Sequence, residues 1–97
     1  SNLALVSLRI YIEKRLQKLI DIYNLESKSD KPLLLYHLKK NDVLNDSELD
    51  GLRNIIIAGN RAAQGVSVDR RALEWAKDVG PKILGILDSK IEQSSKR

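Results

Sequence analysis

The chain has 97 residues, of which 42% are apolar, enough for one modest hydrophobic core and one domain. It contains no cysteine, which excludes a disulfide framework, a zinc-thiolate centre and a cysteine nucleophile. Its 17 basic residues are interleaved with 13 acidic ones, giving a net charge of +4. This pattern is typical of solvated helix faces rather than of a clustered nucleic-acid patch.

The longest apolar runs, 33–36 and 55–58, are far shorter than the roughly 20 residues of a membrane-spanning helix. We therefore expect a soluble, cytoplasmic protein with no membrane insertion by this fragment. The chain has no methionine, even at position 1, and Ser1-Asn2 reads as the remnant of an expression tag. These features predict one helical domain over 3–93, excised from a longer protein, and a frayed polar tail at 94–97.

Two helices are predicted in the first half of the chain. Apolar residues spaced by three and four predict a helix from residue 3 to about 25. A second apolar set widens its stripe, so we expect this helix to be the most buried and to contact two other helices or a second chain. A short helix is predicted over 31–41, because Asp30 can cap it and Pro32 suits its first turn.

Two more helices are predicted in the second half. Asn45 and Glu48 have the spacing of a capping box, and the helix that they begin should end at Gly65. Gly59 costs about 0.5 to 1 kcal/mol in a helix interior, so it indicates a close helix crossing. Ser67 or Asp69 should cap the last helix, and Gly80-Pro81 predicts a kink in it near residue 79, or two abutting helices.

The end of the third predicted helix carries a recognisable motif, Gly59-Asn60-Arg61-Ala62-Ala63-Gln64-Gly65. Together with the order of helices, this stretch resembles the HEPN superfamily over nearly the whole chain. Active members place arginine before the asparagine and histidine before the glycine, and these positions hold Gly59 and Gln64 here. The resemblance implies an all-α, four-helix up-down bundle of HEPN type with a degenerate ribonuclease motif.

Catalysis is not expected from these residues. Metal-independent RNA cleavage needs a group that transfers a proton near neutral pH and a cation that stabilises the transition state. Gln64 does not titrate, and Gly59 carries no charge. The single histidine, His37, lies in an apolar stretch of the second helix, where we interpret it as partly buried or surface-exposed rather than catalytic. We therefore predict no catalytic residue.

A polar stripe beside the apolar face of the third helix is the main candidate site. Arg53, Ile57, Asn60 and Gln64 fall within about 60° of one another on a helical projection, while Arg61 points elsewhere. Three interpretations stay open for the stripe. It is a dimer contact, since HEPN domains commonly pair near this motif. Alternatively, Arg53 holds a phosphate, or the arginine and glutamine face water while Asn60 bonds to backbone.

Other charged and aromatic positions carry weaker predictions. Arg70 and Arg71 are read as a solvated pair, with a salt bridge or a partner contact as alternatives. Trp75 is predicted in the core, with partial exposure as an interface anchor as the alternative. We predict no metal site from the acids around residue 46. A basic strip is predicted only if the first two helices pack side by side and align the lysines and arginine at 14, 15, 18, 39 and 40.

Three functions compete on this basis. The first is a non-catalytic HEPN-like module that forms a homodimer or binds an intramolecular partner domain, and regulates an effector in the rest of a bacterial defence or toxin-related protein. The second is an RNA-binding or ribonuclease domain that uses Arg53, Asn60 and Arg61, with Arg70 and Arg71 as further nucleic-acid contacts. The third is a helical spacer. None of them requires a cofactor.

Overall fold

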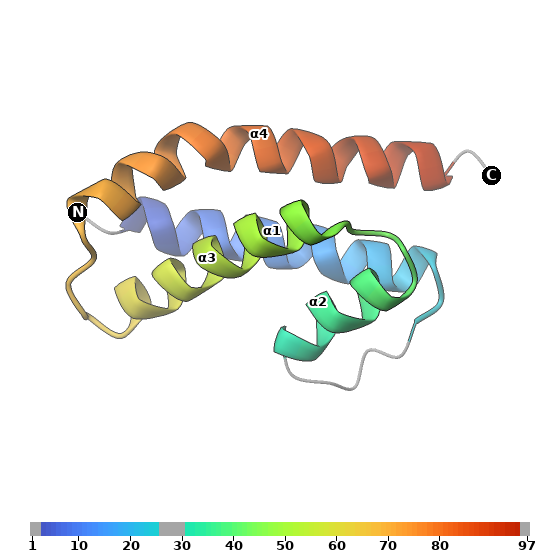
Figure 1. Cartoon of the computed structure of the whole chain (residues 1–97), viewed down its shortest axis with the longest axis horizontal. Helices are drawn as coiled ribbons and strands as arrows, with labels where there is room; N and C mark the ends of the chain where they lie inside the picture. The colour runs from blue at the N-terminus through green and yellow to red at the C-terminus, as the bar shows by residue number, and fades with distance from the viewer. Residues whose placement is uncertain (1–2, 26–30, 96–97) are drawn as a thin grey trace.

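The computed structural model describes residues 3–25 and 31–95, which form four helices (Figure 1). Their bounds are α1 Leu3–Ile22, α2 Lys31–Lys40, α3 Asp46–Ala63 and α4 Arg70–Ser95. No strand occurs within the described ranges, so the prediction of an all-α helical bundle is confirmed. Ser1-Asn2, Asp30 and residues 96–97 lie outside the described residues.

The predicted up-down topology is wrong, because α1 and α4 run in the same direction (Figure 1). Arg15 of α1 bonds to Asp88 of α4, and Tyr23, just past α1, bonds to Ser94, so residue numbers rise together along the two helices. α3 runs antiparallel to both. The reason is the direction of α2, a short side helix that runs the same way as α1. Only α3 among the four described helices therefore runs in the opposite direction, and α4 is parallel to α1.

α1 is the central helix of the bundle, as its double apolar stripe predicts. It packs against α2, α3 and α4, whereas α2 contacts α1 and α3 only, as far as the described residues show. The main core gathers around the second half of α1 and is closed by α2 and the turn after it. Its most buried members are Ile12, Leu16, Leu19, Ile20, Leu38, Leu52, Ile55 and Leu87.

Local signals define the helix ends. The Asn45 side chain accepts the Glu48 amide at 2.8 Å and the Glu48 carboxylate accepts the Asn45 amide at 2.9 Å, so the predicted capping box is confirmed. Gly65, with φ +76°, ends α3 as predicted. The amides of Gly65 and Val66 bond back to the carbonyls of Ala62 and Arg61, which is the hydrogen-bond pattern of a Schellman motif.

Two buried glycines let α3 and α4 approach α1 closely. A Cβ at Gly59 would lie 2.6 Å from Arg9 Cβ and 3.1 Å from the Leu5 carbonyl oxygen. A Cβ at Gly80 would lie 2.7 Å from Leu8 Cδ2. The close crossing predicted at Gly59 is therefore confirmed, and Gly80 makes a second one, against Leu8 of α1.

α4 remains a single helix through Pro81, so the alternative of two abutting helices is wrong. Figure 1 shows the helix axis changing direction before the middle of α4, where a kink is expected. Pro81 and Lys77 are both exposed, so water can satisfy the Lys77 carbonyl that loses its amide donor. The helix continues to Ser95, and Ser94 Oγ donates to Tyr23 Oη at 2.9 Å. Ser94 therefore belongs to the packed bundle and not to a frayed tail.

Candidate functional site

The degenerate motif meets α1 through an arginine that sequence reasoning did not identify. Arg9 Nη1 donates to Asn60 Oδ1 at 2.7 Å, and Arg9 Nε lies 3.4 Å from Glu13 Oε1. The Arg9 side chain is 17% exposed, and Gly59 leaves the space in which its Cβ lies. An arginine therefore stands beside Asn60 although the motif position holds glycine. The unusual glycine was the only sequence signal for it.

The polar stripe of α3 does not form one site. Asn60 is half-buried and bonds to Arg9, so the interpretation that Asn60 bonds to backbone is wrong. Arg53 and Gln64 are exposed. The backbone N–H of Gln64 donates to the carbonyls of Asn60 and Arg61 where α3 ends. Arg61 is exposed on the side of α3 that faces α4. Ile57 of the stripe lines that side too, whereas Asn60 bonds to α1, so the stripe is divided between two surfaces of the molecule.

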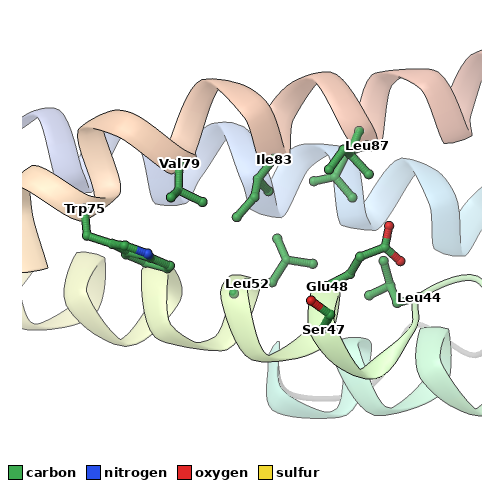
Figure 2. A pocket seen from close by; sticks show the side chains of 10 residues that line it. Leu44, Ser47, Glu48, Leu52, Trp75, Val79, Ile83 and Leu87 are labelled. Carbon is green, nitrogen blue, oxygen red and sulfur yellow. The ribbon is translucent and has the colours of Figure 1, made fainter.

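Sequence reasoning missed an apolar groove that runs between α3 and α4. Its first section has a volume of about 260 Å³ and ends at Leu44. Figure 2 shows side chains from both helices around this section, with the Trp75 ring at one end and Glu48 near the other. α4 contributes Trp75, Val79, Ile83, Ile86 and Leu87, and α3 contributes Ser47, Glu48, Gly51 and Leu52.

A second section continues the groove past Trp75 toward the C-terminal end of α3. It has a volume of about 350 Å³. α3 lines it with Asn54, Ile57, Ala58 and Arg61, and the opposite wall consists of Val68, Asp69, Ala72 and Trp75. Because Trp75 lines both sections, we treat them as one surface, called the α3–α4 groove. We expect a ligand of this groove to touch the indole ring.

The exposure of Trp75 overturns its predicted place in the core. The side chain is 39% exposed, although the neighbouring Ala76 is buried at 1%. α3 and α4 both pack on α1, and between them a Cβ at Gly51 would meet Ile83 Cδ1 at 3.4 Å. The small residue at Gly51 leaves the groove open instead of filling it. The alternative prediction, a partly exposed interface anchor, agrees with this exposure.

Both acidic residues in the described lining of the groove, Glu48 and Asp69, already have partners. The Glu48 carboxylate accepts the Asn45 amide and lies 3.3 Å from Lys90 Nζ. Asp69 Oδ1 accepts the Arg71 amide at 3.4 Å, and the carbonyl of Asp69 accepts from Leu73, so of the two predicted caps it is Asp69 that begins α4. These acids are used by helix starts and an ion pair.

The basic residues fall into paired and unpaired groups. Arg70 Nε lies 3.3 Å from Glu74 Oε1, so the predicted pair of solvated arginines is only partly correct. Arg53, Arg61 and Arg71 are exposed and make no ion pair within the described residues. The unpaired positive charge of this region therefore belongs to these three arginines.

The conditional basic strip on the first two helices includes two residues with acidic partners. Arg15 Nε lies 2.7 Å from Asp88 Oδ1, which draws it toward α4. Lys39 Nζ lies 2.8 Å from Asp46 Oδ1. The hydrogen bond and charge of Asp46 raise the pKa of Lys39 above its ordinary value of 10.5. Two members of the strip are thus neutralised by acids of other elements.

His37 lies apart from these features on α2. It is half-buried, and its ring meets the edge of Tyr36 at a centroid distance of 5.7 Å. In the described part of the chain, no three His, Cys, Asp or Glu side chains are grouped to hold a metal ion. Nor does any helix described there have the length and apolar character needed to cross a bilayer.

No protein-family model matches the chain, and comparisons with curated proteins and with solved structures found no similar protein. The resemblance to HEPN domains therefore rests on the motif and on the order of the helices, and it stays a prediction. The groove and the Arg9–Asn60 contact are observations that do not depend on it.

Proposed function

We propose that this chain is a non-catalytic, HEPN-like interaction module that binds a protein surface in its α3–α4 groove. In this proposal the module regulates an effector in the rest of a longer bacterial protein, in the cytoplasm. The observation that carries the proposal is Trp75, an exposed aromatic side chain that joins two apolar hollows on one face.

The chemistry of the groove supports protein binding. Trp75, Ile57 and Ile86 are 39%, 49% and 43% exposed, so the surface offers apolar area that a partner can cover. Contiguous exposed apolar surface of this kind marks interaction sites, and tryptophan is among the residues that contribute most to binding free energy. The two hollows provide room for apolar side chains of a partner on both sides of the indole ring.

The residues at the degenerate motif support the absence of catalysis. Gln64 stands where the family uses histidine, and its amide side chain transfers no proton near neutral pH. Asn60 Oδ1 accepts from Arg9, a bond that an incoming phosphate would have to compete with. The asparagine of the motif is thus used in a structural contact with α1.

A probe peptide tests the proposal. The probe is a dye-labelled helical peptide with leucine at positions i, i+3, i+4 and i+7 on a glutamine and alanine background, titrated by fluorescence anisotropy. In parallel, sedimentation of the chain alone from about 5 to 500 µM, a range that brackets micromolar dissociation constants, measures self-association. We expect saturable binding of the probe or reversible dimerisation.

Matched variants connect either result to the groove. Ile86→Ser should weaken the association, because Ile86 lines the groove and is 43% exposed. Ile10→Ser makes the same change at a 39% exposed position of α1 outside the groove, and should leave the association unchanged. A chain that stays monomeric and binds no probe, or that responds equally to both substitutions, contradicts the proposal.

RNA binding is a second candidate, favoured by the unpaired Arg53 and Arg61. Phosphate contacts release counterions, so RNA binding should weaken steeply as salt rises. A titration with labelled single-stranded RNA at low salt, repeated with Arg53→Ala and Arg61→Ala, tests it. If no RNA binds, or if neither substitution weakens binding, this candidate fails.

A further inference from the structure

The charges around the α3–α4 groove indicate what kind of protein segment it takes, an inference that rests on the proposed function. Arg61 lines the second section of the groove directly. Arg53 lines neither section of the groove, and its charge acts on Lys39 of α2. Arg71 stands one turn before Trp75 on α4, at a spacing of four. Arg61 thus brings positive charge to the lining of the groove, and Arg71 brings more one turn away from Trp75.

These arginines are not neutralised within the described residues. None of them makes an ion pair there. The two acids that line the groove are used elsewhere, since Glu48 is held by Asn45 and Lys90 and Asp69 caps α4. An incoming segment therefore meets apolar walls and an uncompensated positive rim.

We propose that the α3–α4 groove binds an acidic amphipathic helix of a partner protein. Apolar side chains on one face of that helix would occupy the hollows on both sides of Trp75, as in other complexes where a helix lies in a groove. Carboxylates beside that apolar face would meet Arg61 and Arg71. Oppositely charged rims of this type increase association rate and select the partner.

Two other occupants fit the observations less well. A second copy of this chain, which has a net charge of +4, would bring arginine rims of the same sign together across a two-fold axis. RNA would gain from the arginines, but the walls formed by Val79, Ile83 and Leu87 offer neither phosphate ligands nor base hydrogen bonds. The aliphatic walls favour a protein segment, and the rim favours an acidic one.

Three peptides with identical leucine positions test the inference. Their remaining surface positions carry glutamate, glutamine or lysine, and each is titrated against the chain by fluorescence anisotropy. Two exposed charge contacts should make the glutamate peptide bind about three- to tenfold tighter than the glutamine peptide at 50 mM salt. The lysine peptide should bind weakest, and the differences should shrink at 500 mM salt because exposed charges are then screened.

Two variants connect the preference to the arginine rim. Arg61→Ala should reduce the ratio of affinities between glutamate and glutamine peptides. Lys14→Ala removes the same charge from the exposed surface of α1, outside the groove, and should leave that ratio unchanged. A change of similar size in both variants would mean that net charge, and not the rim, sets the preference, which overturns the inference.

The remaining outcomes separate this inference from the proposed function. Equal affinity for all three peptides overturns the acidic partner but leaves an apolar-binding module. If the chain forms a dimer that Ile86→Ser dissociates, the acidic partner is also overturned, because a second copy of the chain then occupies the groove. If an oligouridine probe displaces the glutamate peptide, and Arg61→Ala abolishes this displacement, the arginines bind RNA and the inference is also overturned. If no peptide binds and the chain is monomeric, both proposals fail.

Discussion

Replacing Gly59 by alanine should destabilise the bundle, although alanine is the better helix former. In an open helix position the exchange stabilises by about 0.5 to 1 kcal/mol. At Gly59 the new Cβ would lie 2.6 Å from Arg9 Cβ, a separation that real Cβ atoms do not show. Because Arg9 Cβ is attached directly to the backbone of α1, the helix itself must move.

The expected balance follows from these two terms. Overpacking of this type costs typically about 1 to 3 kcal/mol, which outweighs the helix propensity gained. We expect a net loss of about 1 to 2 kcal/mol in the free energy of unfolding. For a domain of this size each kcal/mol corresponds to a fall of about 4 to 8 °C in Tm. Urea unfolding and thermal melting, both followed by circular dichroism, measure the two quantities.

Two other glycines provide internal comparisons. Gly85 has no heavy atom within 4 Å of its hypothetical Cβ, so Gly85→Ala should raise Tm. At Gly80 the nearest atom is Leu8 Cδ2, the end of a flexible side chain, so Gly80→Ala should cost less than Gly59→Ala. Equal stabilisation by Gly59→Ala and Gly85→Ala would refute the close contact of α1 with α3.

Three further substitutions test local features by the same unfolding measurements. Asn45→Ala should cost about 1 kcal/mol through loss of the α3 cap, and a stability within error of wild type would contradict the capping box. Gly65→Ala should lower the free energy of unfolding by about 1 to 2 kcal/mol. The loss comes from the backbone, since φ is +76° and a Cβ would meet no heavy atom within 4 Å; asparagine tolerates this φ better, so Gly65→Asn should cost less. Tyr23→Phe should cost about 0.5 to 1.5 kcal/mol, and adding Ser94→Ala should cost little more, because both changes remove the same hydrogen bond.

The candidate site could be predicted only in part. The motif stretch directed attention to Asn60 and Arg61. In the structure Asn60 bonds to Arg9 of α1 and Arg61 lines the α3–α4 groove. Arg9 was missed because its contact with Asn60 joins residues 51 positions apart, and no short-range pattern reports such a pair. The groove was missed because helical periodicity shows that Trp75 shares a face with Ala72 and Val79, but not how closely another helix covers that face.

Features that depend on neighbouring residues follow from the amino-acid sequence alone. These are the four helices, the capping box at Asn45, the end of α3 at Gly65 and the need for a close crossing at Gly59, all set by backbone preference and local hydrogen bonds. By contrast, the parallel direction of α1 and α4, the bond between Arg9 and Asn60 and the exposure of Trp75 over a groove appear only in the folded chain. Those features depend on how whole helices pack, because a periodic apolar stripe states which side is buried without naming its neighbour.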